Sequence, residues 1–261
     1  MKENKKKIFF FVRNGYFKFK LNKFFFRKVE KILKNSFVEQ TKEKKIDLKK
    51  IHKILDINSL NEKRFKIFNK LKKNEEFIKY IFLSAENEIY SVVGNEISSG
   101  DPNISIQLPN DKSSVLDMHT DFFSGESLFQ VNLWIPMMNV KKTQSMFIIS
   151  PEISKEIIKK IKNKKNYDFE LIKKRYQKHL NFLSVNHGEA ILFSPNCLHG
   201  NVVNNEKNSR VSINIRFKNL FSPHNNLNNE KRIGTFYKPF KLRAVTNFNL
   251  KYNFDEIINN D

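Results

Sequence analysis

Residues 210–217 read Arg-Val-Ser-Ile-Asn-Ile-Arg-Phe, a strict alternation of polar and apolar side chains. Because residues two apart on a β-strand point to the same face, this pattern predicts a strand with one polar and one apolar face. The polar face carries Arg210, Ser212, Asn214 and Arg216. On an ordinary half-exposed strand these arginines would face water, whereas inside an apolar barrel they favour a bound ligand, in particular a buried carboxylate.

Short apolar or alternating runs also precede this strand. Each run is bounded by Pro, Gly, Asn or Asp, which is typical of several short strands that form a barrel or a sandwich. A Lys-rich amphipathic stretch interrupts the runs at about residues 151–180, and Ser150-Pro151-Glu152 is a typical helix start. The predicted strands cover residues 104–108, 128–136, 145–149, 190–193 and 211–217.

The first hundred residues have a different, mainly helical pattern. Residues 8–20 are expected to form a strand pair around the turn dipeptide Asn14-Gly15, and residues 23–34 a helix. Ser59 and Glu62 have capping-box spacing at the start of a longer helical region. Apolar residues then follow at helical spacing, with Phe65, Phe68 and Leu71 in one set and Phe77, Ile81 and Ala85 in another that runs toward Gly94.

No internal repeat or Pro/Gly/Ser-rich linker divides the chain, so residues 1–261 are expected to form one domain. It would comprise an N-terminal strand and helices (1–100), a barrel core with its helical insertion (103–223) and a C-terminal extension (224–261). The fold class expected is mainly β with α, in which helices flank a barrel.

The net charge of +21 by itself suggests a nucleic-acid or anionic-membrane partner. Only eight of the 48 basic residues are Arg, however, and the lysines are spread along the whole chain. With Asn, Ile and Phe also abundant, this composition indicates an AT-rich genome and a solvated surface, with attraction of anionic substrates as a second role.

The single cysteine, Cys197, excludes an intramolecular disulfide framework and a Cys-based zinc site. The apolar run that begins at Ile8 stops at Arg13, too short for a signal sequence or a membrane span. A cytoplasmic protein is therefore expected.

One group of residues carries the chemistry. His119 and Asp121 are two apart just before a predicted strand, so both can face one metal ion. His199 follows a second predicted strand and supplies a third ligand. Two histidines and one carboxylate form the facial arrangement of non-haem Fe(II) oxygenases, which leaves positions open for a co-substrate and O2. The remaining histidines are expected to be structural or exposed; they are His52, His179, His187 and His224.

From His119 to Pro223 the chain resembles the 2-oxoglutarate/Fe(II)-dependent oxygenases of the phytanoyl-CoA dioxygenase-like superfamily. Within them it is similar to the oxygenases of sporadic bacterial carbohydrate gene clusters. The Asn14-Gly15-Tyr16 turn also resembles the usual opening of this superfamily. The matching segments are His119-Thr120-Asp121, Leu133-Trp134-Ile135-Pro136, Thr143-Gln144-Ser145-Met146, Gly188–Phe193, His199-Gly200-Asn201, Arg210–Phe217 and Phe221-Ser222-Pro223.

The resemblance implies a double-stranded β-helix, a jelly-roll or cupin-like barrel with flanking helices. It implies that His119, Asp121 and His199 bind iron, and that Arg210 and Ser212 bind the C5 carboxylate of 2-oxoglutarate. With Fe(II), 2-oxoglutarate and O2 as cofactors, the expected reaction is hydroxylation of a carbohydrate-related small molecule or a glycoconjugate precursor. The side chains expected to line the substrate cavity are Gln107, Asn132, Trp134 and Arg216, for which barrel packing or loop hydrogen bonding is the alternative.

One feature departs from the superfamily: a Pro-Gly-Ser-His turn is common after the strand at Met146, whereas this chain has Ser150-Pro151-Glu152. The substrate entrance therefore differs. The carboxylate Asp121 argues against a halogenase, in which chloride takes that position.

Three alternatives remain. An AlkB-like nucleic-acid demethylase would account for Arg210 and Arg216 and for the high charge, but no Asn-x-Tyr element precedes His119. A non-enzymatic, cupin-like metal-binding barrel would not need the polar face at Arg210. A basic RNA-binding protein would leave the two histidines and Asp121 unexplained.

Overall fold

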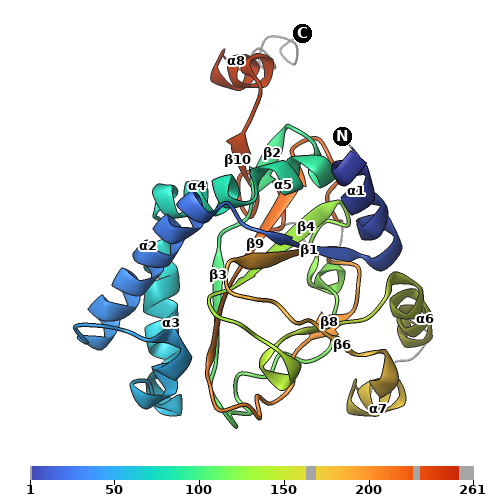
Figure 1. Ribbon diagram of the computed structural model, residues 1–261. Helices are drawn as coiled ribbons and strands as arrows, with labels where there is room; N and C mark the ends of the chain where they lie inside the picture. The colour runs from blue at the N-terminus through green and yellow to red at the C-terminus, as the bar shows by residue number, and fades with distance from the viewer. Residues whose placement is uncertain (1, 163–168, 226–229, 253–261) are drawn as a thin grey trace.

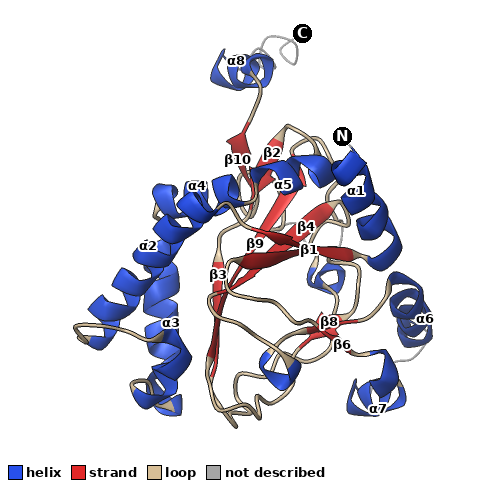
Figure 2. Cartoon of the chain, viewed as in Figure 1, coloured by secondary structure: helices blue, strands red, loops and turns tan. Residues whose placement is uncertain are grey.

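The computed structural model describes residues 2–162, 169–225 and 230–252. Its β-structure consists of two antiparallel sheets, and helices from the N-terminal half pack against the larger one (Figure 1, Figure 2). The larger sheet has seven strands in the order β1-β7-β4-β9-β2-β10, with β3 also paired to β9, and the smaller has the order β6-β5-β8. Within the described residues these sheets do not close into a barrel.

The long strand β9 (Arg210–Asn219) organises the larger sheet. One of its edges pairs with β4 (Gln130–Pro136), and the other pairs first with β3 (Asn103–Gln107) and then with β2 (Ile97–Ser99). β4 in turn pairs with β7 (Glu189–Phe193). The outer strands are β1 (Tyr16–Lys20), which pairs with β7, and β10 (Lys238–Lys241), which pairs with β2.

The smaller sheet is made of three two-residue strands. β5 (Phe147–Ile148) pairs with both β6 (Asn181–Phe182) and β8 (His199–Gly200). The helices α6 (Pro151–Lys162) and α7 (Phe169–Arg175) lie between β5 and β6 in the chain. Both lie within residues 151–180, where a helical stretch was expected, and residues 163–168 are outside the described part of the chain.

Helices from the first hundred residues cover the apolar face of the larger sheet. Alternate residues of β9, among them Val211, Ile213 and Phe217, are fully buried in one core with apolar side chains of these helices. Burial of each such side chain contributes about 1.5–3 kcal/mol. The helices concerned are α2 (Lys23–Thr41), α3 (Ile57–Leu71), α4 (Glu75–Ser84) and α5 (Glu86–Val93).

The other described helices contribute less to this core. α1 (Lys2–Asn14) precedes β1, and α8 (Ala244–Tyr252) follows β10 and stands away from the body of the protein (Figure 1). Short 3-10 helices also occur, at Leu48–Lys53, Asp121–Ser124, Lys142–Gln144 and Gln177–His179. Among the helices of the described residues, none combines the length and apolar character that crossing a bilayer requires.

The strand pair predicted for residues 8–20 is wrong. The chain is helical up to Asn14, and Gly15 (φ +75°) ends that helix with its N–H donating to the carbonyl of Phe11. Asn14-Gly15 thus acts as a helix terminus, for which a left-handed glycine is as typical as for a hairpin turn. β1 pairs instead with β7, more than 160 residues away in the chain.

The capping box predicted at Ser59 is also wrong. The N-cap of α3 is Asp56, whose carboxylate accepts hydrogen bonds from the backbone N–H and the hydroxyl of Ser59. Asp at an N-cap is at least as favourable as Ser, so the helix begins three residues earlier. Glu62 forms an ion pair with Lys66 one turn further on.

The turn at Gly15 gives a first testable prediction. A Cβ atom on Gly15 would overlap the Sγ of Cys197, whereas a Cβ on Gly188 (φ +84°) would have nothing within 4 Å. Gly188→Ala should therefore lower the free energy of unfolding by about 1–2 kcal/mol, only because an alanine is strained at this positive φ. Gly15→Ala should cost about 1–3 kcal/mol more, because it also overpacks the core. Urea unfolding of both variants measures the difference, and equal losses would contradict the predicted overlap.

Candidate functional site

The polar face of β9 continues across the neighbouring strands. Ser105 of β3 is in register with Ser212, and Trp134 and Asn132 of β4 are in register with Asn214 and Arg216. Residues paired across neighbouring strands point to the same face of a sheet. The strands thus form a continuous, mainly polar surface on the face opposite the helix-packed core.

Two histidines are placed side by side by backbone pairing at the smaller sheet. His119 and His199 exchange both backbone hydrogen bonds, each at 3.0 Å, as an antiparallel bridge next to β8. Their imidazole rings lie 4.4 Å apart between centroids. Asp121 begins a short 3-10 helix two residues after His119, and its backbone N–H donates to the carbonyl of Pro195. The His-x-Asp segment is thereby fixed against the loop that carries His199.

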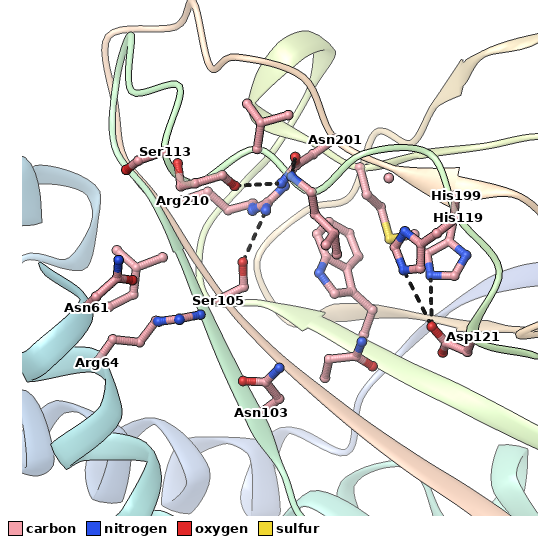
Figure 3. A pocket seen from close by; sticks show the side chains of 18 of the residues that line it. Asn61, Arg64, Asn103, Ser105, Ser113, His119, Asp121, His199, Asn201 and Arg210 are labelled. Carbon is pink, nitrogen blue, oxygen red and sulfur yellow. Dashed lines mark hydrogen bonds and ion pairs between the residues drawn. The ribbon is translucent and has the colours of Figure 1, made fainter. Parts of the chain in front are cut away.

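Figure 3 shows the two imidazoles and the carboxylate of Asp121 converging at one end of a cavity. One ligand atom from each of His119, Asp121 and His199 lies within 4.8 Å of the other two. The Nε2 atoms of the two histidines are 3.5 and 3.7 Å from Oδ1 of Asp121. In the part of the chain that the structure describes, this is the one group of three such side chains that could hold a metal ion.

The hydrogen bonds of the two rings fit metal binding. Nδ1 of His119 lies 2.7 Å from the carbonyl of Asp117, and Nδ1 of His199 lies 2.9 Å from the carbonyl of Cys197. Because a carbonyl oxygen only accepts, each Nδ1 carries the proton and each Nε2 presents a lone pair toward Asp121. A metal-binding histidine typically has this second hydrogen bond, which fixes its tautomer and ring orientation.

The protonation states suit the same role. Burial lowers the pKa of His199 to about 4, so its imidazole is neutral at physiological pH. Burial opposes ionisation of Asp121, but the positive charge of Arg216 and the hydrogen bond from Asn132 help to hold the pKa of this carboxyl well below its usual range. A neutral imidazole and an ionised carboxylate are the forms that bind divalent metals.

A buried polar network supports Asp121 from behind. Asn132 donates to its Oδ2 and accepts a hydrogen bond from Gln130, which also donates to Glu126 at 2.6 Å. Arg216 donates from Nε to Glu126 at 2.8 Å and lies 3.7 Å from Oδ2 of Asp121. Sequence reasoning missed Glu126 and Gln130, although the alternation of polar side chains at 130 and 132 could have indicated the latter.

This network gives a second prediction. Asn132→Ala should weaken divalent-metal affinity about 10- to 100-fold, as loss of an outer hydrogen bond to a metal ligand does, because Asp121 loses the amide that orients it. Asn139→Ala, which removes an exposed asparagine just beyond the same strand, should leave that affinity unchanged. Titration with Co(II), followed by its visible absorption, measures both, and an unchanged affinity in Asn132→Ala would show that Asp121 is oriented without Asn132.

Arg210 is a buried cation without an acidic partner. It is 3% exposed, and no carboxylate of the described residues forms an ion pair with it. Its guanidinium donates to the carbonyl of Gln144 and to the hydroxyl of Ser105, both at 3.3 Å, and lies 6.0 Å from the centre of the Trp134 ring. Its Nε has no partner within the described chain. Burial lowers the pKa of Arg210 to about 10, a sign of how costly its desolvation is.

A cavity of about 320 Å³ joins Arg210 to the two histidines and Asp121. Trp134 and Arg216, two of the four side chains predicted to line the substrate cavity, also line it, as does Asn214 from the polar face of β9. Asn132 and Gln107 do not line it: Asn132 lies behind Asp121, and Gln107 donates to the carbonyl of Val202. Among the described residues, neither the hydroxyl of Ser212 nor Oδ1 of Asn214 has a hydrogen-bond partner, although both are buried.

The other histidines do not line this cavity. His52 is bonded to Ser209, His187 to Glu30, and His179 and His224 contact the rings of Tyr176 and Tyr237. Cys197 is buried, and that burial raises its pKa to about 12, as fits a small core residue.

Comparison with known proteins shows that the chain is similar in fold to several solved structures. No protein-family model matches the chain, and no curated protein does. Among solved structures, it is similar to EvdMO1 (TM-score 0.56, 12% identity, 83% of this chain and 50% of that one). It is also similar to the nickel complex of ThoJ, a non-heme monooxygenase (0.54, 11%, 94% of each chain), and to AviO1 from Streptomyces viridochromogenes Tue57 (0.50, 12%, 84% and 96%).

These likenesses define the class of fold. The chain is a mixed α/β protein with antiparallel sheets, and it shares its overall fold with structures that include a non-heme monooxygenase. It spans half the length of EvdMO1 but nearly the whole of ThoJ and AviO1. At 11–12% identity the likeness extends to fold alone.

Proposed function

We propose that this chain is a non-haem Fe(II) oxygenase that depends on 2-oxoglutarate and is built on a double-stranded β-helix. The observation that carries the proposal is the pairing, in one cavity, of a two-histidine, one-carboxylate group with a buried arginine that has no acidic partner. The first suits Fe(II), and the second suits the distal carboxylate of a dicarboxylic co-substrate.

His119, Asp121 and His199 would hold the iron through two Nε2 atoms and a carboxylate oxygen. Their donor set and tautomers fit a divalent ion. Bound Fe(II) and 2-oxoglutarate together would supply activation of O2 for oxidation of a substrate C–H bond. The chain's own residues orient these groups and shield them from water.

Arg210 and Ser212 would bind the C5 carboxylate of 2-oxoglutarate. The unpartnered Nε of Arg210 and hydroxyl of Ser212 are the donors that a carboxylate would satisfy. Trp134, whose ring lies beside the guanidinium, would form the apolar wall of this subsite. A bound carboxylate would neutralise a buried cation that otherwise bears its full desolvation cost.

The substrate would be a carbohydrate-related small molecule or a glycoconjugate precursor. The polar lining of the cavity supports a hydroxyl-rich ligand, since Asn103, Ser105 and Asn214 all contribute to it. Hydroxylation is the simplest reaction for such a site. The high positive charge of the chain would favour approach of an anionic substrate.

Anaerobic titration with Fe(II), with and without 2-oxoglutarate, tests the function. A weak visible charge-transfer band should appear only when both are present, because it requires the keto acid to be chelated to bound iron. Iron binding without this band would indicate a metal protein of another kind. Absence of iron binding would overturn the proposal altogether.

A further inference from the structure

A third arginine faces the same cavity from a different element. Arg64 lies in the middle of α3, beside the edge strand β3, and Figure 3 shows its guanidinium directed into the space between Asn61, Asn103 and Ser105. α3 is in contact with β3, and Arg64 is among the residues that line the cavity. A neighbouring pocket shares Arg64, Asn103 and Arg216 with the first, which places Arg64 where the two meet.

The carboxylates around Arg64 already form ion pairs with other basic residues. Glu126 forms ion pairs with Arg216 and Lys231, at 2.8 and 3.6 Å, and Asp101 forms one with Lys238 at 2.9 Å. Asp121 belongs to the proposed metal site. Among the described residues, no carboxylate forms an ion pair with Arg64.

The cavity therefore holds one cation that the proposed function does not use. Arg216 is matched by Glu126 and Asp121, and Arg210 would be matched by 2-oxoglutarate. Binding of Fe(II) and of the doubly charged co-substrate adds two positive and two negative charges, so Arg64 would still lack a counter-charge. Its neighbours Asn61, Asn103 and Asn214 are neutral hydrogen-bonding groups, which suit a polar ligand.

We infer that Arg64 is a specificity-determining residue that binds an anionic group of the substrate, either a carboxylate or a phosphate. A guanidinium fork can bind two oxygens of either group through two parallel hydrogen bonds. The anionic group would lie at the α3 side of the cavity, and the rest of the substrate would extend past Ser105 and Asn214 toward His119 and Asp121. This inference rests on the proposed function, which assigns Arg210 to the co-substrate.

Titration of the wild-type protein with inorganic phosphate and with acetate tests it. The protein is loaded with Zn(II), so that no turnover occurs, and with saturating 2-oxoglutarate, so that Arg210 is occupied. Trp134 is the only tryptophan of the chain and lines the cavity, so its fluorescence reports binding there. At least one of the two anions should bind, and Arg64→Ala should weaken that binding about tenfold or more.

The control variant is Arg27→Ala, which removes an exposed arginine from another helix, α2, and should bind the anions as the wild type does. Preference for phosphate or for acetate would identify the kind of anionic group. Equal affinity in the wild type and Arg64→Ala, or no binding of either anion, would overturn the inference. Arg64→Ala must also keep the wild-type affinity for 2-oxoglutarate. If the wild type itself fails to bind 2-oxoglutarate, the proposed function is what has failed.

Discussion

His199→Ala will abolish tight binding of Fe(II), lowering its affinity by more than about 100-fold. Among the described residues, His199 is one of three side chains that converge on the site, and loss of an outer hydrogen bond alone costs 10- to 100-fold in such sites. His119→Ala should act in the same way. The charge-transfer band of the iron–2-oxoglutarate complex should disappear in both variants, and anaerobic titration followed by visible absorption measures this.

The matched control is His187→Ala, which removes a histidine that is bonded to Glu30 and is not part of the convergent group. It should retain the wild-type iron affinity and band. Far-ultraviolet circular dichroism of all variants must show that the fold is kept, because His199 is buried. A folded His199→Ala protein with wild-type iron affinity would place the metal elsewhere.

Arg210→Met will have two opposite effects. Affinity for 2-oxoglutarate should fall by about 30-fold or more, since loss of one partner of a buried charge pair costs about 2 kcal/mol or more. The ligand-free protein should nevertheless be as stable as the wild type or more stable, because a buried cation without an acidic partner is replaced by an apolar side chain of similar length. Urea unfolding with and without 2-oxoglutarate separates the two effects.

Arg216→Met provides the contrast on the same face of β9. It would leave Glu126 and Asp121 buried without their main counter-charge, and should lower the free energy of unfolding by about 3–5 kcal/mol. If Arg210→Met were the more destabilising of the two, Arg210 would be a structural residue. The carboxylate subsite would then have to be sought elsewhere in the cavity.

Much of the sheet could be predicted because its pattern is local. The runs at 104–108, 128–136, 190–193 and 211–217 all contain strands, since short alternating or wholly apolar runs between turn residues are typical of strands. The pairing of His119 with Asp121 could be predicted for the same reason. His199 could be predicted as a third ligand because it follows a recognisable strand.

The N-terminal turn could not be predicted because the partner of β1 is distant in the chain. Asn14-Gly15 suits both a hairpin and a helix end, and only the availability of β7 decides between them. The exact start of α3 depended on two adjacent capping residues, Asp56 and Ser59, of nearly equal preference. Glu126 and Arg64 have no local pattern that indicates a role.

The amino-acid sequence by itself determined the strands, the polar face of β9 and the residue types that can hold a metal. These follow from periodicity and side-chain chemistry, which act over a few neighbouring residues. Only the tertiary structure decided which charges are matched: Arg216 by Glu126, and neither Arg210 nor Arg64 by any described carboxylate. The reason is that charges are matched through space over a few ångströms, and folding brings together side chains such as Arg216 and Glu126, which are 90 residues apart in the chain.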